Sequence, residues 1–406
     1  MTEHTTEFSP SLREQILEAV SRTVQTRFFD PNFNGRDWQS LVQNARDQIL
    51  RAQEPVEFES SVDELLKRLS AHPVGFFHQT RAKVPFHHVL RATLFPRNGN
   101  WVFQDVQEDG AAHEAGIKPG DALTAVNDEP VVPPEPVRFP AGREASVVIR
   151  RRGGAEERIV PSAPPADVAR KQSVRVAVLH DGVGYLKITR FPGLVGVDMA
   201  RDIDSAIQQL SECRAAVIDL RGNPGGGSAN LRLMSYLTPD KRPVGYSLTR
   251  PRAERGYRRE ELAQFRRIPY NKLALVWLAL RFKFADKSIV VVTEGMKPPR
   301  FQGRVVLLVN EHTVSGAEIV AGFVKDHQLA VIVGRRTAGR LYGWSSFPIQ
   351  QQYRLTIPVS NYLTWEGKCF EGSGIAPDVE VPFSPEAALE GRDHQLEEGT
   401  RIAASL

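Results

Sequence analysis

The sequence lacks most of the features that mark secreted or membrane-bound proteins. Its 406 residues include only two cysteines, Cys213 and Cys369, far apart in the chain. A disulfide framework is therefore excluded, and we expect two free thiols in a reducing compartment. No apolar run approaches the roughly 18 residues of a membrane-spanning helix. The N-terminal segment has no basic start followed by an apolar stretch, so it predicts a cytoplasmic protein, although a trimmed chain would look the same.

The sequence also lacks a strong charge of either sign. Its net charge is +4, from 52 basic and 48 acidic residues, which does not by itself indicate nucleic-acid binding. One segment, residues 250–283, is nonetheless strongly basic, with interspersed aromatic residues. This pattern fits a nucleic-acid patch, a solvated insertion, or a rim that attracts acidic substrates. The rest of the chain favours the last two, so we expect no nucleic-acid partner.

The chain is long enough for two or three domains, and the patterns of its apolar residues divide it into three regions. Residues from about 10 to 85 show apolar side chains at helical spacing, such as Ile16, Val20 and Val24. They predict an N-terminal helical bundle within residues 1–90. Residues 169–406 alternate apolar strands with amphipathic helices, around a basic insertion at about 240–300. Their strands (182–188, 215–220, 304–309 and 330–334) predict a largely parallel sheet covered on both faces.

Between these two regions, residues 91–168 have a β texture. Strands are expected at 101–106, 122–127 and 146–152, whereas the proline-rich stretch Pro130 to Pro140 cannot be a central strand. The segment Ala115-Gly-Ile-Lys-Pro-Gly-Asp-Ala-Leu and the order of elements resemble a PDZ domain. The carboxylate-binding loop of that family is poorly matched by Pro96-Arg-Asn-Gly-Asn, so an unrelated small β domain is the alternative.

Two glycine-containing segments follow buried strands and carry the candidate chemistry. The first is Ile218-Asp-Leu-Arg-Gly-Asn-Pro-Gly-Gly-Gly, whose glycines let backbone N–H groups approach a ligand. A phosphate-binding loop is the rival, but no Gly-Lys-Ser/Thr follows. The second is Asn310-Glu-His-Thr-Val-Ser-Gly-Ala-Glu-Ile, which enters a helix at Ser315. Ser315 is either a reactive serine or only a helix cap, with Glu318 completing a capping box.

Together these segments resemble the carboxyl-terminal processing (tail-specific) proteases. Blocks beginning at Asp219, Ser315 and Gly374 (Gly-Ile-Ala-Pro-Asp-Val-Glu-Val) match that family in order, and the resemblance covers about residues 10 to 385. It implies an α/β multidomain fold: a helical bundle (1–90), a PDZ-like β domain (91–168) and a ClpP/crotonase-like α/β protease core (169–406). It also implies that Ser315 is the nucleophile.

One departure from the family changes the expected mechanism. The best-known members use a lysine 25 residues after the serine, and here that position holds Arg340, within Thr337-Ala-Gly-Arg. Arginine does not lose its proton in a protein, so it cannot be the general base. Arg340 is instead a candidate for binding a substrate carboxylate.

The tricorn core protease, a relative, uses serine, histidine and glutamate. This chain resembles it at Leu69-Ser-Ala-His-Pro and at Glu371-Gly-Ser-Gly-Ile-Ala-Pro-Asp, except that Ala71 stands where the tricorn pattern has a serine. The resemblance implies a triad of Ser315, His72 and Glu371. His72 would move the proton and Glu371 would orient the imidazole.

The developing oxyanion would be held by the N–H of Gly316 and by that of Gly225 or Gly226. Among the other histidines, His78 competes with His72, His312 is a local alternative, and the adjacent pair His87 and His88 lacks further ligands at metal-binding spacing.

These features predict a serine endopeptidase that cleaves peptides or unfolded protein tails and recognises them in part through a free C-terminus. No cofactor, metal or membrane span is expected, and an oligomer is possible. The alternatives are a non-catalytic ligand- or peptide-binding protein on the same core, as in retinoid-binding relatives, and a PDZ scaffold with a decayed protease core.

Overall fold

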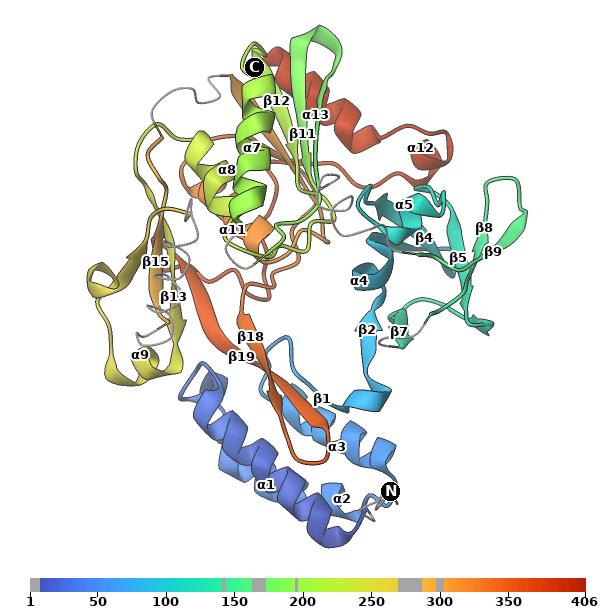
Figure 1. Cartoon of the computed structure of the whole chain (residues 1–406), viewed down its shortest axis with the longest axis vertical. Helices are drawn as coiled ribbons and strands as arrows, with labels where there is room; N and C mark the ends of the chain where they lie inside the picture. Colours follow the sequence, from blue (N-terminus) through green and yellow to red (C-terminus); the bar gives the residue numbers. More distant parts are fainter. Residues whose placement is uncertain (1–7, 141–143, 163–172, 194–195, 269–286, 297–302) are drawn as a thin grey trace.

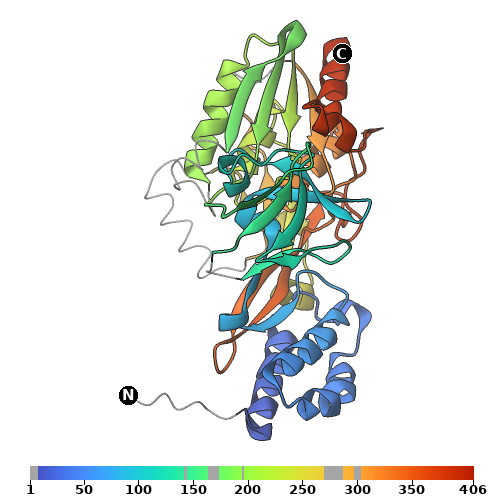
Figure 2. The ribbon, with the colours of Figure 1, turned by 90° about the vertical axis from the view of Figure 1, so that its right-hand side faces the viewer.

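The computed structural model describes residues 8–140, 144–162, 173–193, 196–268, 287–296 and 303–406. Figure 1 shows three parts: N-terminal helices below, a small β sheet at the side, and a larger α/β core above. Figure 2, turned by 90°, shows the helices and the core at opposite ends of the molecule. None of the described helices is both long and apolar enough to cross a membrane.

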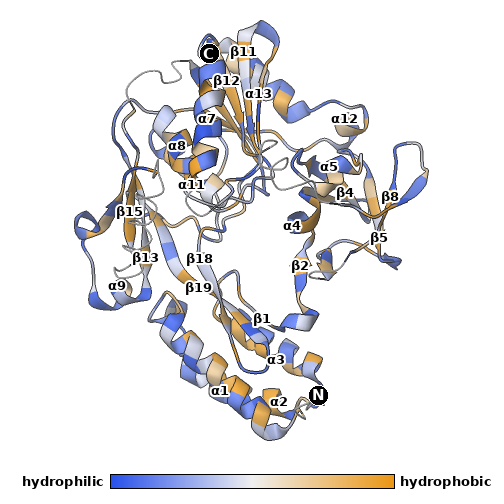
Figure 3. Cartoon of the chain, viewed as in Figure 1, coloured by the Kyte–Doolittle hydropathy of each residue, from blue (hydrophilic) through white to orange (hydrophobic). Residues whose placement is uncertain are grey.

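The N-terminal part is a bundle of three helices, as the sequence predicts. They are α1 (Pro10–Arg27), α2 (Trp38–Arg51) and α3 (Pro55–Lys67). α1 begins where the Ser9 hydroxyl accepts a hydrogen bond from the Leu12 N–H, with proline in the first turn, and Asp37 caps α2 in the same way. The apolar faces of these helices meet in one buried cluster, and Figure 3 shows hydrophobic and hydrophilic residues alternating along them.

A second sheet connects these helices with the core. It runs β1-β19-β13-β15-β14, with β18 on the other edge of β19. The strands are β1 (Gly75–His78), β13 (Pro243–Thr249), β14 (Ala263–Phe265), β15 (Ile289–Val292), β18 (Gly343–Pro348) and β19 (Tyr353–Thr364), and α9 (Arg250–Arg255) follows β13. The helical prediction for the end of the 10–85 region is therefore wrong. Residues 75–78 pair antiparallel with 353–356, a long-range contact that local spacing cannot reveal.

The core is a six-stranded sheet in the order β10-β11-β12-β16-β17-β20, parallel except for the β10–β11 pair. Its strands are β10 (Val174–Val178), β11 (Val183–Ile188), β12 (Ala215–Asp219), β16 (Arg304–Val309), β17 (Val331–Gly334) and β20 (Val379–Glu380). All five residues of β12 are buried, which is why the strand reads as a continuous apolar run.

Helices cover both faces of the core sheet, which confirms the α/β prediction. One face packs against α7 (Val197–Gln209), α8 (Asn230–Tyr236) and α11 (Gly316–Asp326). The other packs against α13 (His394–Ser405), which follows the short α12 (Pro385–Leu389). Figure 3 shows the hydrophobic colour concentrated on the strands between them. The two C-terminal helices were not foreseen from the sequence.

The small sheet has the order β3-β4-β5-β8-β9, with β6 at the end of β5, and is called the β3–β9 sheet below. Its strands are β3 (Ala92–Arg97), β4 (Asn100–Val106), β5 (Ala122–Val126), β6 (Glu129–Pro130), β8 (Val147–Arg150) and β9 (Glu156–Ile159). Short elements flank it: β2 (Lys83–Pro85), α4 (Phe86–Leu90), α5 (Ala111–Glu114) and β7 (Arg138–Pro140).

The three strands expected in this region are confirmed, and the segment Pro130 to Pro140 contributes only the short β6 and β7. The stretch 96–100 is the tight β3–β4 hairpin turn, with Asn98 and Gly99 at positive φ. The predicted domain limits stay predictions. Phe86 and Leu90, placed in the first domain by the sequence, pack into the core of the β3–β9 sheet.

Candidate active site

Ser315 lies where a buried strand of the core sheet gives way to a helix. β16 ends at Val309, the loop 310–315 follows, and α11 begins at Gly316. The half-buried Ser315 has φ 54° and ψ −116°, a strained backbone conformation for a residue with a side chain. Such strain persists only where the surroundings enforce it, and it is frequent at reactive residues.

Glu318 enforces this conformation. Its side chain is fully buried, and Oε2 accepts hydrogen bonds from the N–H groups of Ser315 (3.0 Å) and Arg340 (2.8 Å). Oε1 accepts from the Thr337 hydroxyl (2.7 Å) and the Gly339 N–H (2.6 Å). Burial raises the pKa of this carboxyl, and the four donors oppose the rise. A helix cap alone would explain the bond to Ser315 but not the three bonds to the 337–340 loop.

Backbone N–H groups without partners lie beside Ser315. A Cβ on Gly225 would stand 2.8 Å from the Cβ of Ser315 and 2.7 Å from the Gly316 nitrogen, so only glycine fits at position 225. The Gly225 N–H itself donates to the Asn223 side chain at 2.8 Å. The N–H groups of Gly226 and Gly316 donate to no residue that the structure describes. Of the two alternatives left by the sequence, Gly226 is thus the one with an available donor.

An ion-pair network holds the strand that leads to these glycines. Arg221 donates to Asp219 Oδ2 (2.7 Å) and to both carboxylate oxygens of Asp393 (2.8 and 2.7 Å), while Gln395 accepts from the same guanidinium at 3.1 Å. Asp219 and Arg221 are buried, and Tyr185 donates its hydroxyl to Asp219 at 2.9 Å. The block beginning at Asp219 therefore supports residues 221–227, which are called the glycine loop below.

Glu371 and Arg340 lie on the other side of the nucleophile loop. Glu371 Oε2 accepts from the N–H groups of Leu341 (2.5 Å) and Tyr342 (3.0 Å), and its Oε1 accepts from no described residue. Burial raises the pKa of Glu371, opposed by these two donors and by the charge of Arg340. The guanidinium of Arg340 is exposed and forms no ion pair with a described acid.

The structure does not join His72 to Ser315. His72 is exposed, lies between α3 and β1, and makes no hydrogen bond with any described residue. In Figure 1 β1 lies beside the N-terminal helices, whereas α11 belongs to the core. The N-terminal helical part does contact a residue bound to Glu371. The rings of Phe29 and Tyr342 are 4.6 Å apart, and the Tyr342 N–H donates to Glu371. The His72 assignment stays a prediction.

The two alternative histidines have hydrogen-bond partners other than the serine. His78 shares a 2.8 Å hydrogen bond through Nδ1 with the Thr80 hydroxyl, and its ring meets Tyr353 edge-on. His312 is fixed in the nucleophile loop through its backbone N–H, which donates to the Asn310 side chain at 3.2 Å.

His87, on α4, is a neighbour of the site that sequence reasoning missed. Burial is the main cause that lowers its pKa to about 3, and the charges of His88, His312 and Arg340 add to it. The ring centroids of His87 and His88 are 4.2 Å apart. Proximity to His312 and Arg340 places His87 near the nucleophile loop, and no sequence motif signals this contact. Among the described residues, no group of three or more His, Cys, Asp or Glu could hold a metal ion.

Comparison with known proteins finds relatives among the peptidases. Residues 182–381 match the peptidase family S41 profile. The chain is 24% identical, over 96% of its length, to tricorn protease homolog 1 of Streptomyces coelicolor, but it spans only about a third (35%) of that protein. It is 23% identical, over 91% of its length, to carboxyl-terminal-processing peptidase 3, chloroplastic, of Arabidopsis thaliana, covering 70% of it.

Among solved structures, the photosystem II D1 C-terminal processing protease matches with a TM-score of 0.60 at 18% identity, covering 97% of both chains. This likeness confirms the multidomain α/β fold expected from the sequence.

Proposed function

We propose, from the membership of residues 182–381 in peptidase family S41, that this chain is a serine endopeptidase acting through an acyl-enzyme on Ser315. The observation that carries the proposal is the position of Ser315. Its strained backbone stands at the start of α11, directly against the glycine loop, beside the N–H groups of Gly226 and Gly316, which donate to no described residue. Two such donors and a helix N-terminus stabilise negative charge on a carbonyl oxygen under attack. The non-catalytic alternative is not favoured, since the relatives named above are proteases.

The proposed reaction has two halves, acylation and deacylation, and each catalytic group acts in both. Ser315 Oγ attacks the scissile carbonyl while His72 removes its proton, and the oxyanion accepts from Gly226 and Gly316. The imidazolium then protonates the leaving amine, which leaves an ester on Ser315. Water enters, gives a proton to His72 and attacks the ester carbonyl, and His72 then returns the proton to Ser315 Oγ as the acid leaves. Glu371, with Oε1 unengaged, would accept from the imidazole and stabilise its charged form.

His72 has to approach Ser315 for this mechanism to operate, and His87 is the rival general base. With its pKa lowered to about 3, His87 is neutral at pH 7 and ready to accept a proton, but it is a weak base. His72 is exposed. We therefore keep His72 as the proposed base and use His87 as the competing variant in the test.

Arg340 supplies the selectivity that we propose for substrates. Its N–H and that of Ser315 bond to the same oxygen of Glu318, so their nitrogens lie no further apart than the two bond lengths combined. An exposed guanidinium on a residue whose backbone lies this close to the nucleophile favours a carboxylate near the scissile bond, either a substrate's C-terminus or an acidic side chain. The tight turn at 96–100 offers little support for a separate C-terminus site in the β3–β9 sheet.

The enzyme claim is tested with the wild-type chain and Ser315→Ala on a denatured protein and a peptide library, with a fluorophosphonate label as a second readout. We expect wild type to cleave and label, and Ser315→Ala to lose both by about 10⁴-fold or more. A wild type that does neither contradicts the proposal. His72→Ala and His87→Ala then identify the base: activity retained in the first and lost in the second reassigns it.

The carboxylate preference is tested with peptide pairs that differ only in a free or amidated C-terminus, or in Asp against Asn beside the cleaved bond. We expect Arg340→Gln to reduce the preference for the charged member by about tenfold. Arg335→Gln is the matched control, because Arg335 is exposed on the same segment and pairs with Glu380 at 2.8 Å. Equal cleavage of both members by wild type would refute the role of Arg340.

A further inference from the structure

One strand of the β3–β9 sheet makes direct polar contact with both loops of the candidate site. Gln104 Nε2 donates to Glu311 Oε1 at 3.3 Å, in the nucleophile loop. Gln107 Nε2 donates to the Arg221 carbonyl at 3.1 Å, in the glycine loop. Gln104 and Gln107 are buried, although more than a hundred positions separate them from their partners. The β3–β9 sheet thus forms one wall beneath the active-site loops.

Asp105, between these two glutamines, makes the central contact. Its Oδ2 accepts from the side-chain amide of Asn310 at 2.8 Å and from the Thr93 hydroxyl at 2.6 Å. Asn310 is completely buried, and its Oδ1 accepts from the N–H groups of Gly222 (3.0 Å) and His312 (3.2 Å). The Asn310 amide therefore connects Asp105 with Gly222, four positions before Gly226, and with His312, three positions before Ser315.

The chemistry of an amide explains why Asp105 matters for this arrangement. An asparagine side chain has one end that accepts and one that donates, whereas an ionised carboxylate only accepts. Because Asp105 can only accept, the NH₂ end of Asn310 must face it. The Asn310 oxygen must therefore face the two loops. If the amide turned over, its NH₂ would meet the N–H groups of Gly222 and His312, leaving buried donors without acceptors. Asp105 thereby selects the orientation that holds both loops.

We propose that Asp105 is a positioning residue for catalysis, acting through Asn310 to hold the glycine loop and the nucleophile loop in their relative positions. The proposal rests on the proposed function, because positioning has a catalytic effect only if Ser315 reacts. It assigns to the β3–β9 sheet a part in building the active site itself. Asp105 touches neither the nucleophile nor the oxyanion donors, and its influence passes through one hydrogen bond.

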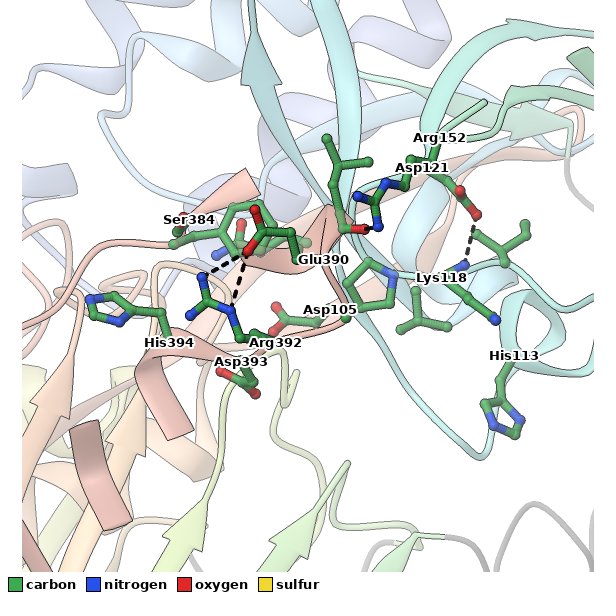
Figure 4. A pocket seen from close by; sticks show the side chains of 18 of the residues that line it. Asp105, His113, Lys118, Asp121, Arg152, Ser384, Glu390, Arg392, Asp393 and His394 are labelled. Atoms are coloured by element: carbon green, nitrogen blue, oxygen red, sulfur yellow. Dashed lines mark hydrogen bonds and ion pairs between the residues drawn. The ribbon is translucent and has the colours of Figure 1, made fainter. Parts of the chain in front are cut away.

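The surroundings of Asp105 make the idea testable without destroying the fold. Asp105 is only half-buried, and it also borders a cavity of about 1020 Å³ between the β3–β9 sheet and residues 383–395 (Figure 4). The cavity has polar walls, including Lys118, Arg392 and Asp393. Water can therefore enter the space that a truncated Asp105 leaves, so we expect Asp105→Ala to fold.

Three variants separate positioning from simple stability. Asp105→Ala removes the acceptor for Asn310. Asp105→Asn keeps a carbonyl oxygen that can accept from Asn310 and serves as the conservative rescue. Thr93→Val is the matched control, because it removes the other hydrogen bond to the same carboxylate oxygen, together with the bond that the Asp105 N–H donates to the Thr93 hydroxyl, and leaves the Asn310 contact in place.

We expect Asp105→Ala to lower kcat by about ten- to a hundredfold with KM changed by less than about threefold, since misplaced catalytic groups slow the chemical step. Labelling by the fluorophosphonate should slow in parallel. Asp105→Asn should recover most of the rate, and Thr93→Val should stay within about threefold of wild type. Equal rates for Asp105→Ala and Thr93→Val, with equal losses in Tm, would reduce Asp105 to a structural residue and overturn the proposal.

A second readout works even if the chain proves inactive. Hydrogen exchange measured by mass spectrometry should be faster in Asp105→Ala than in Thr93→Val for peptides covering 221–227 and 310–316. Unchanged exchange there contradicts the positioning role. Faster exchange in a protein that neither cleaves nor labels would preserve the structural link while the proposed peptidase function fails.

Discussion

Glu318→Gln tests whether one buried carboxylate holds the nucleophile in place. Glu318 accepts two hydrogen bonds on each oxygen, from three backbone N–H groups and one hydroxyl. Glutamine keeps one oxygen but presents an NH₂ group to the two donors on the other side. Two hydrogen bonds to a charged group are then lost, each contributing about 1.5–3 kcal/mol. Removing a charge from a fully buried position offsets part of this loss.

The net expectation is a loss of about 2–4 kcal/mol in the free energy of unfolding, measured by urea denaturation followed by circular dichroism. Labelling of Ser315 by the fluorophosphonate should fall by about a hundredfold, because Glu318 bonds to the backbone that is held at φ 54°. Glu380→Gln is the control: this exposed glutamate pairs only at the surface, with Arg335, and should change stability by less than about 1 kcal/mol. A Glu318→Gln variant that matches Glu380→Gln in both assays would refute this account of the site.

Three further predictions follow from the same contacts. Burial tends to raise the pKa of Asp393, but the charge and hydrogen bonds of Arg221 outweigh it and lower the pKa to about 2. Wild type should therefore lose stability as the pH falls from about 4 to about 2, and Asp393→Asn should flatten that loss by about 1 kcal/mol, a small value because the side chain is 45% exposed. Because the pKa of His87 is lowered, the protein should be fully stable above about pH 6.5 and should lose stability as the pH falls toward 3. Thermal melts recorded across this range should show a smaller loss for His87→Gln. Identical pH profiles for the variant and wild type would contradict this role of His87. Gly226→Ala should abolish labelling of Ser315, since a Cβ there would overlap the Phe191 carbonyl, and labelling at the wild-type rate would exclude Gly226 from the oxyanion site.

The features that sequence reasoning could locate are those in which local pattern and packing agree. Ala215–Asp219 is buried along its whole length, so its apolar run predicted a core strand, and the glycines that follow it do lie against Ser315. The fold class followed from the same alternation of strands and helices. The match of the Asp219 block to the family also has a physical explanation, because Arg221 binds Asp219 and Asp393 there.

What could not be predicted depends on contacts between distant parts of the chain. The strand Gly75–His78 pairs with residues 353–356, and nothing within its own four residues distinguishes it from the end of a helix. The link between Asp105 and Asn310 joins two ordinary polar residues whose meaning appears only when β4 is placed beneath the loops. His87 comes near Arg340 for a similar reason. The partner of Ser315 among the histidines is still a prediction.

The Arg221 network also has a consequence for the newly made chain on the ribosome. Arg221 supports the glycine loop, yet its partners Asp393 and Gln395 are translated more than 170 residues later. At about 5–20 residues per second, many seconds pass between the two events. Until residue 395 emerges, the arginine lacks acceptors from two of its three partner residues, and the loop beside Ser315 lacks its support. Under the proposed function, a nascent chain is therefore expected not to cleave itself or its neighbours during synthesis.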